Sequence, residues 1–140
     1  MYKRQKSYGY TGDGLAAILR ESGIFAEFHD PDMLVLMLSP LCGDGTLEKL
    51  RAALLAVERK APITETPPPV PSPKWALTTR EAIFAPSEII PVDRILGRVS
   101  AAAAISCPPA VPIAVCGEMI DECVVRNFKY YGIEKCAVIK

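Results

Sequence analysis

A proline-rich segment near the middle of the chain limits the possible folds more than any other feature of the sequence. Residues 61–73 read APITETPPPVPSP. Proline fixes φ and lacks a backbone N–H, so this composition excludes a helix and favours an extended, semi-rigid spacer. We therefore expect two folded parts, residues 1–60 and residues 77–140, joined by a linker over residues 61–76.

The composition allows both parts to fold and narrows the partners. Hydrophobic residues make up 50% of the 140 residues and charged residues 23%, which is enough apolar side chain for two small cores. Lys+Arg and Asp+Glu balance at 16 each, so charge gives no argument for nucleic acid or an anionic membrane. The longest apolar run, MLVLMLSPLC, is too short to span a bilayer. We expect neither partner.

The cysteines indicate a reducing environment. Five cysteines occur with no CxxC pair, and the single histidine, His29, is far in sequence from all of them except Cys42. An odd number of scattered thiols is typical of a cytoplasmic protein and disfavours both a disulfide framework and a zinc site. The sequence therefore predicts a cytoplasmic location.

Residues 1–60 have the pattern of a small α+β lobe. Thr11 or Asp13 can cap a helix that Gly23 ends, and Leu47, Leu50 and Leu54 mark the apolar side of a second helix. The pattern predicts helices over 11–23 and 46–60 and strands over 24–30 and 33–38, with a possible first strand over 3–10. This order predicts a small antiparallel sheet covered by two helices.

Residues 77–140 predict a smaller α+β extension. Thr78 and Glu81 have the spacing of a capping box before a short helix that runs through Phe84. Strand-like and turn-like pieces follow, then a helix over 119–132 and a last strand over 136–139.

One acid gives the second part a candidate site. The stretch PPAVPIAVCGEMI, residues 108–120, is apolar and rich in turn residues until Glu118. A carboxylate just before a helix can cap free N–H groups and sit favourably in the helix field. Alternatively, Glu118 faces a substrate. The residues alone leave both readings open.

Three other features have simpler explanations. The glycines of GYTGDG form a turn before a helix but lack the lysine of a phosphate-binding loop. His29 is expected to be an exposed residue at a strand end, although Glu27 shares its face. The aromatic residues Phe128, Tyr130 and Tyr131 are expected to pack the last helix and not to stack on a ligand.

Three segments together resemble the C-terminal part of the bacterial Orn/Lys/Arg decarboxylases: SYGYTGDGLAAILRESGIFAEFHD, TTREAIFAPSEIIPVDRILGRVSA and PPAVPIAVCGEMI. The residues that match the family patterns are Gly9, Tyr10, Thr11, Gly12, Leu15, Leu19, Arg20, Glu21, Gly23, Ile24, Glu27, Asp30, Pro91, Gly97, Arg98, Ser100, Ala101, Pro108, Pro109, Pro112, Gly117 and Glu118. The chain departs from the third pattern at Cys107, Ala110 and Cys116.

The resemblance implies a part of a larger enzyme. These decarboxylases are pyridoxal-phosphate (PLP) enzymes of the aminotransferase fold that act on ornithine, lysine or arginine in polyamine biosynthesis. Residues 1–60 would correspond to the small domain. The Ser-x-His-Lys segment that carries the cofactor lysine is absent from this sequence, so we expect no cofactor in this chain alone and PLP in the parent enzyme.

By resemblance, the chain would shape the substrate site, make oligomer contacts and partner the large PLP-binding domain. Glu118 would bind the distal cation of a basic substrate. The alternative is a stand-alone interaction or regulatory module that kept the fold and lost the chemistry.

Overall fold

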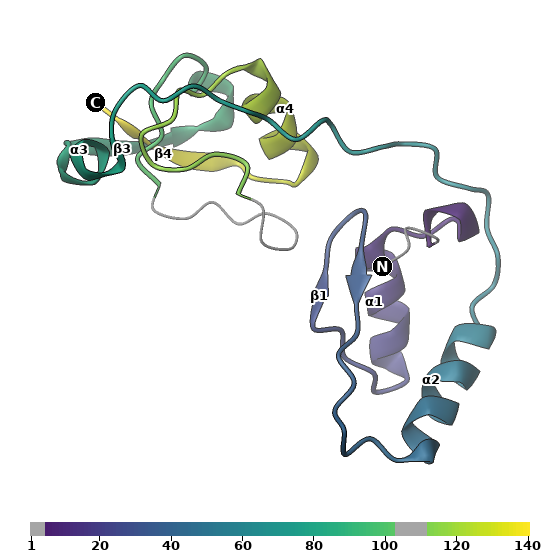
Figure 1. Cartoon of the computed structure of the whole chain (residues 1–140). Helices are drawn as coiled ribbons and strands as arrows, with labels where there is room; N and C mark the ends of the chain where they lie inside the picture. The colour runs from purple at the N-terminus through teal and green to yellow at the C-terminus, as the bar shows by residue number, and fades with distance from the viewer. Residues whose placement is uncertain (1–4, 103–111) are drawn as a thin grey trace. The chain divides into compact units, whose positions relative to one another are not determined.

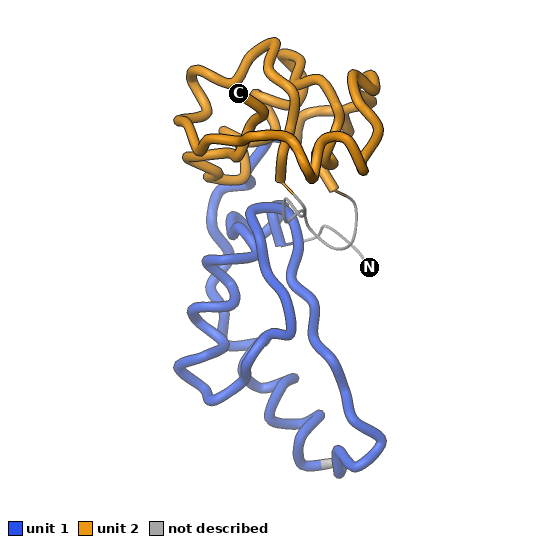
Figure 2. The backbone as a smooth tube through the Cα atoms, turned by 90° about the vertical axis from the view of Figure 1, so that its left-hand side faces the viewer, with its two compact units in different colours: residues 1–66 blue, residues 67–140 orange. Residues whose placement is uncertain are grey.

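Two units make up the chain in the computed structural model, which describes residues 5–102 and 112–140. Unit 1 is Met1–Thr66 and unit 2 is Pro67–Lys140 (Figure 2). The division falls inside the proline-rich segment. Each unit is α+β with a small antiparallel pairing of strands, as the sequence predicts for the fold class.

Unit 1 is a helix packed on a short hairpin, followed by a second helix. Its elements are η1 (Lys6–Tyr8), α1 (Gly12–Glu21), β1 (Phe28–His29), β2 (Leu34–Val35) and α2 (Asp44–Leu55). The side chain of Thr11 accepts a hydrogen bond from the Gly14 N–H, which confirms one of the two predicted caps. After α1, Gly23 takes a φ of 68° that favours glycine.

The strands of unit 1 are shorter than the sequence predicts. Phe28 pairs with Val35 and His29 with Leu34, whereas strands were expected over 24–30 and 33–38. An apolar run becomes a strand only where another backbone offers hydrogen bonds, and Met37 beyond β2 remains 71% exposed. The possible first strand over 3–10 is also wrong for its described part, residues 5–10, because the 3₁₀ helix η1 lies there, while residues 3 and 4 lie outside the described residues.

Among the described elements of unit 1, α1 is the helix that packs on the hairpin (Figure 1). Leu19 of α1 is fully buried. A side chain at Gly12 would place its Cβ 2.0 Å from the Met33 carbonyl oxygen, so the start of α1 touches the hairpin turn. By contrast, α2 does not pack on the hairpin, and its Leu54 and Leu55 side chains are exposed. The sequence predicts two helices over the sheet, and in the structure one of them, α1, covers it.

Charged residues are buried beside the hairpin turn of unit 1. Lys6 Nζ lies 2.7 Å from Asp32 Oδ1, and Asp32 is 1% exposed. The same ammonium donates to the Glu65 carbonyl oxygen at 2.8 Å. Asp30 shapes the turn, since its Oδ1 accepts from the N–H groups of Asp32 and Met33. This cluster holds the beginning of the proline-rich segment against unit 1.

Unit 2 is built on a longer hairpin-like pairing. Its elements are α3 (Thr79–Phe84), β3 (Ser87–Pro91), η2 (Val92–Arg94), α4 (Glu122–Tyr130) and β4 (Lys135–Ile139). β3 and β4 are antiparallel, with Ser87 opposite Ile139 and Pro91 opposite Lys135. The predicted capping box of α3 is confirmed by reciprocal hydrogen bonds between Thr78 and Glu81.

The core of unit 2 lies between these strands and α4. It consists of Val92, Ile95, Ile113, Ala114, Ile120, Val124, Phe128, Cys136 and Val138. Asn127 of α4 is also buried, and its amide donates to the carbonyl oxygens of Pro69 and Cys123. The later part of the proline-rich segment is thereby bound to unit 2, while Ile63 N–H donates to the Lys6 carbonyl oxygen in unit 1.

Candidate functional site

The backbone of Glu118 lies between two other segments of unit 2. On one side, the Ser100 N–H donates to the Glu118 carbonyl oxygen at 2.8 Å. On the other side, Glu118 faces Trp75 in an antiparallel bridge. Segment 99–101 in turn pairs with β4 through Ser100 and Val138. Glu118 is therefore tied through backbone pairing to the main strands of the unit.

Gly117 allows this close pairing. Its φ is 98°, a backbone conformation that residues other than glycine rarely adopt. A Cβ added to Gly117 would lie 2.5 Å from the Leu77 carbonyl oxygen. The Gly117 carbonyl oxygen accepts from the N–H groups of Ala76 and Leu77 at 2.9 and 3.1 Å. The glycine of the quoted stretch therefore fixes where the next residue, Glu118, projects.

The Glu118 carboxylate serves the loop that precedes it. Its Oε2 accepts from the Val115 N–H at 2.8 Å, and Glu118 N–H donates to the Val115 carbonyl oxygen at 3.1 Å. Its Oε1 has no hydrogen-bond donor among the described residues. One oxygen thus orients the side chain and the other is available to a ligand.

The helix-cap reading of Glu118 is wrong. α4 starts at Glu122, three residues later than the predicted 119, and Asp121 is its N-cap, accepting from the Val124 N–H at 2.9 Å. Met119 and Ile120 cannot belong to the helix because both pair with the 98–99 segment. The predicted substrate-facing role is a separate matter and stays a prediction.

Cys107, Pro108, Pro109 and Ala110 lie outside the described residues. Cys116, the third departure from the family pattern, is buried.

Trp75 is the residue of this site that the sequence analysis missed. It lies opposite Glu118 and is 59% exposed. Nothing in the sequence signals the pairing, because the two residues are far apart along the chain.

The simpler explanations given for the other motifs hold. At the glycine-rich turn, the N–H groups of Asp13 and Gly14 are already bound by Asp30 and Thr11, which leaves those amides unavailable to a phosphate. His29 is exposed at the end of β1, and its Nδ1 lies 2.7 Å from Asp13 Oδ1, not beside Glu27.

The aromatic residues of α4 and its C-terminal end pack within the unit. Phe128 is fully buried in the core. The rings of Tyr130 and Tyr131 meet edge to face at 5.0 Å. Stacking on a ligand is not needed to explain them.

The described lysines do not fit a PLP site. Such a site needs a buried amine with a partner for the ring nitrogen. Lys6 is the only buried lysine in the described part of the chain, and Asp32 and the Glu65 carbonyl already hold its ammonium. Among the described residues no cluster of three or more His, Cys, Asp or Glu side chains is arranged to hold a metal ion.

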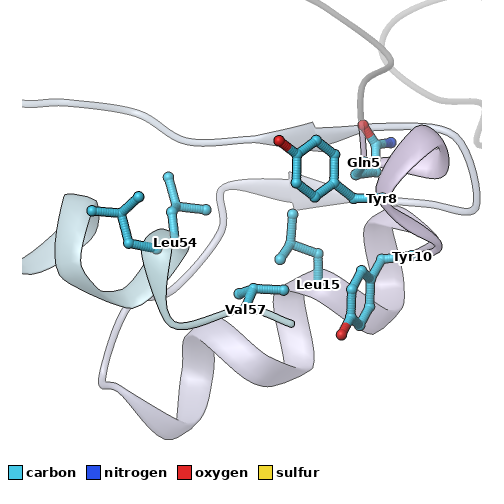
Figure 3. A pocket seen from close by; sticks show the side chains of 7 residues that line it. Gln5, Tyr8, Tyr10, Leu15, Leu54 and Val57 are labelled. Atoms are coloured by element: carbon cyan, nitrogen blue, oxygen red, sulfur yellow. The ribbon is translucent and has the colours of Figure 1, made fainter. Parts of the chain in front are cut away.

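A cavity of about 340 Å³ opens in unit 1 between residues 5–10 and the C-terminal end of α2 (Figure 3). Tyr8 and Tyr10 lie on one side and Leu54 on the other, with Leu15 and Val57 beneath. None of the described residues that line it is charged. Its chemistry suits apolar side chains and not a basic amino acid.

In the described ranges, no helix has the length and apolar character that crossing a membrane requires.

Comparisons with known proteins agree on one family. The family model described as "Orn/Lys/Arg decarboxylase, C-terminal domain" matches residues 58–134. An arginine decarboxylase of Bacillus subtilis (strain 168) is 32% identical in an alignment of 132 positions, which covers 89% of this chain and 26% of the relative.

A solved structure of the constitutive lysine decarboxylase of E. coli aligns with a TM-score of 0.63 at 19% identity. The alignment covers 90% of this chain and 28% of the other. Because the identity is only 19%, this likeness supports the fold alone. The chain spans about a quarter of the length of both proteins.

Proposed function

Because this chain belongs to the family of Orn/Lys/Arg decarboxylase C-terminal domains, we propose that it acts as the C-terminal portion of a PLP-dependent decarboxylase of a basic amino acid. The family match over residues 58–134 carries this proposal. The similarity to an arginine decarboxylase extends it to 89% of the chain. PLP would come with the rest of the enzyme, since no described lysine fits it, and the chain would not be catalytic alone.

The partner would be the large PLP-binding domain of the same enzyme. Unit 1 exposes apolar side chains that an isolated lobe has no reason to expose: Phe25 (72%), Met37 (71%), Leu38 (53%), Leu41 (94%) and Leu55 (71%). Phe25, Met37 and Leu38 line one hollow of the unit, and exposed apolar side chains gathered in this way are typical of an interface. We propose that the large domain or a second copy of the enzyme covers it, in a cytoplasmic homo-oligomer.

Glu118 would give the enzyme its preference for a basic substrate. Its Oε1 has no donor in the described part of the chain, and the Val115 hydrogen bond keeps the carboxylate from turning freely. A positioned carboxylate binds an ammonium or guanidinium by a charge-assisted hydrogen bond, which an uncharged side chain of the substrate cannot make.

The test is Glu118→Gln in the full-length decarboxylase. Glutamine keeps the shape and can still accept from Val115, but it removes the charge. A charge-assisted hydrogen bond contributes ~1.5–3 kcal/mol, so kcat/KM for arginine, lysine or ornithine should fall roughly 10- to 100-fold.

Glu134→Gln is the matched control, because Glu134 is an exposed glutamate of the same unit. Equal kcat/KM for the two variants would refute the role of Glu118. Full decarboxylation by the 140-residue chain with added PLP would refute the proposal that catalysis needs the large domain.

A further inference from the structure

The outer edge of β2 carries backbone hydrogen-bonding groups that the described part of the chain does not use. The carbonyl oxygens of Met33 and Val35 accept from N–H groups on the β1 side of the hairpin, at 3.0 and 2.9 Å. Alternate residues of a strand in an antiparallel pair direct their N–H and C=O groups to opposite sides. Leu34 and Leu36 therefore direct theirs away from β1, and among the described residues neither has a hydrogen-bond partner on that side.

The sequence of this edge is that of an inner strand. Residues 33–38, MLVLML, contain no charge, proline or glycine. A continuous apolar run is typical of a strand that is covered on both faces. Here α1 packs against both β1 and β2, so it covers a face of the hairpin and leaves the edge of β2 open. Beyond β2, Met37 and Leu38 are exposed.

The free edges of two other strands carry features that protect an edge from another chain, namely charges and proline. Glu27 and Asp30 lie directly beside β1. On β3, the Pro86 carbonyl oxygen and the Val92 N–H both bond to the β4 side, so the alternate residue Pro91 directs its nitrogen outward. A proline there offers no donor to a further strand. The edge of β2 has neither form of protection.

We propose that β2 pairs with β2 of a second copy of this chain, antiparallel and about a two-fold axis through Val35. In this register Leu34 lies opposite Leu36 of the other copy, and such a pair exchanges both of its backbone hydrogen bonds. The outward N–H and C=O groups of Leu34 and Leu36 are then used in both copies.

Charge and shape favour a second copy as the occupant. A two-fold axis places a residue against itself, so a charge at the axis would meet its own like charge. Val35 is uncharged and β-branched, which suits a pair whose Cβ atoms are about 4.5–5.5 Å apart. Met37 lies opposite Met33, again without charge. The proposal deepens the homo-oligomer of the proposed function and rests on it only for its place in the enzyme, since the pairing involves this chain alone.

The association of the 140-residue chain with itself tests the proposal directly. Sedimentation equilibrium should show monomers and dimers with a dissociation constant on the order of 100 micromolar, because a single strand pair is a small interface. Amide hydrogen exchange locates the contact. The amides of Leu34 and Leu36 should gain protection as the chain concentration rises, and the Val35 amide, which faces β1, should not change.

Variants separate strand pairing from general apolar association. Leu36→Pro removes an N–H that the hairpin does not use and should weaken the dimer at least about tenfold. Val35→Lys and Val35→Glu should each be monomeric, and an equimolar mixture of the two should dimerise. Leu41→Ser is the control, because Leu41 is 94% exposed outside the edge, and its dissociation constant should equal that of the native chain. Circular dichroism checks folding, and hydrogen exchange needs no variant.

A monomeric chain at millimolar concentration would overturn the proposal. Dimers would overturn it as well if Leu34 and Leu36 gained no protection, or if Leu41→Ser weakened them as much as Leu36→Pro. Shielding of the Leu34 and Leu36 amides only in the full-length enzyme would assign the edge to the large domain instead. The kinetic test of Glu118→Gln is independent, so a dimer found beside unchanged kcat/KM leaves the pairing standing while the proposed role of Glu118 fails.

Discussion

Replacing Gly117 with alanine should destabilise unit 2 far more than the same change at Gly97. Both glycines have positive φ, 98° at Gly117 and 75° at Gly97. Their surroundings differ, because an added Cβ at Gly97 would meet no atom within 4 Å, whereas at Gly117 it would lie 2.5 Å from the Leu77 carbonyl oxygen. Gly97→Ala therefore isolates the backbone strain, and Gly117→Ala adds a steric clash.

The expected magnitudes follow from these contacts. Holding alanine at positive φ costs ~1–2 kcal/mol, of which ~0.4–1 kcal/mol is offset by the smaller entropy of the unfolded chain. Gly97→Ala should thus cost about 1 kcal/mol. Gly117→Ala must also move the 74–77 segment, which breaks the hydrogen bonds from Ala76 and Leu77 to the Gly117 carbonyl oxygen. At about 1 kcal/mol each, the total loss is about 3 kcal/mol.

Trp75 makes the measurement specific to unit 2. It is the only tryptophan of the chain and belongs to this unit, so its fluorescence in a urea titration follows the unfolding of unit 2. The free energies of unfolding of the two variants should differ by about 2 kcal/mol. For a unit of this size, that difference corresponds to roughly 8–16 °C in melting temperature.

Equal free energies of unfolding for Gly117→Ala and Gly97→Ala would refute this reasoning. They would mean that the close approach of Leu77 to Gly117 contributes nothing to unit 2, and that Glu118 is not positioned by that contact.

Three further predictions concern buried polar groups. Lys6→Met should cost ~3–5 kcal/mol of unit 1 stability, because it removes the ammonium 2.7 Å from the buried Asp32 carboxylate, and Lys6→Met/Asp32→Leu should recover most of it in circular dichroism melts. Burial raises the pKa of the Asp30 carboxyl, so the folded state binds this proton more tightly than the unfolded chain. The bound proton therefore stabilises the folded state at low pH, and this stabilisation is lost as pH rises through the folded pKa of Asp30. Asparagine carries no such charge at high pH, so the Asp30→Asn variant should become more stable relative to the native chain from about pH 4 upward. Amide hydrogen exchange measures this difference in stability. Burial also raises the pKa of the Cys136 thiol to about 11, so at pH 8 alkylation followed by peptide mass analysis should label the partly exposed Cys123 and spare Cys136.

Local signals in the sequence were sufficient for the helix starts that depend on nearby residues. Thr11 caps α1, and Thr78 with Glu81 forms the capping box of α3, because each motif is completed within three residues along the chain. The same logic was misleading at Glu118. A carboxylate before an apolar helical pattern satisfies the rule for a cap, but Asp121 satisfies it too, and only the pairing of residues 119 and 120 with the 98–99 segment decides between them.

The strands and the buried charges depended on the tertiary structure for the same reason. The apolar runs 24–30 and 33–38 permit a strand anywhere along their length, but the paired strands extend only over Phe28–His29 and Leu34–Val35, with single backbone hydrogen bonds from Glu27 and Asp30 at their ends. Lys6 gave no sign of burial, since its partner Asp32 and the Glu65 carbonyl come from elsewhere in the unit.

By itself, then, the sequence determined the α+β class, the caps of α1 and α3 and the family, all of which rest on neighbouring residues or on a joint order of segments. Only the tertiary structure decided that Trp75 lies opposite Glu118. That pairing arises from backbone hydrogen bonds between segments more than 40 residues apart, and such long-range bonds leave no periodic trace in the residues that make them.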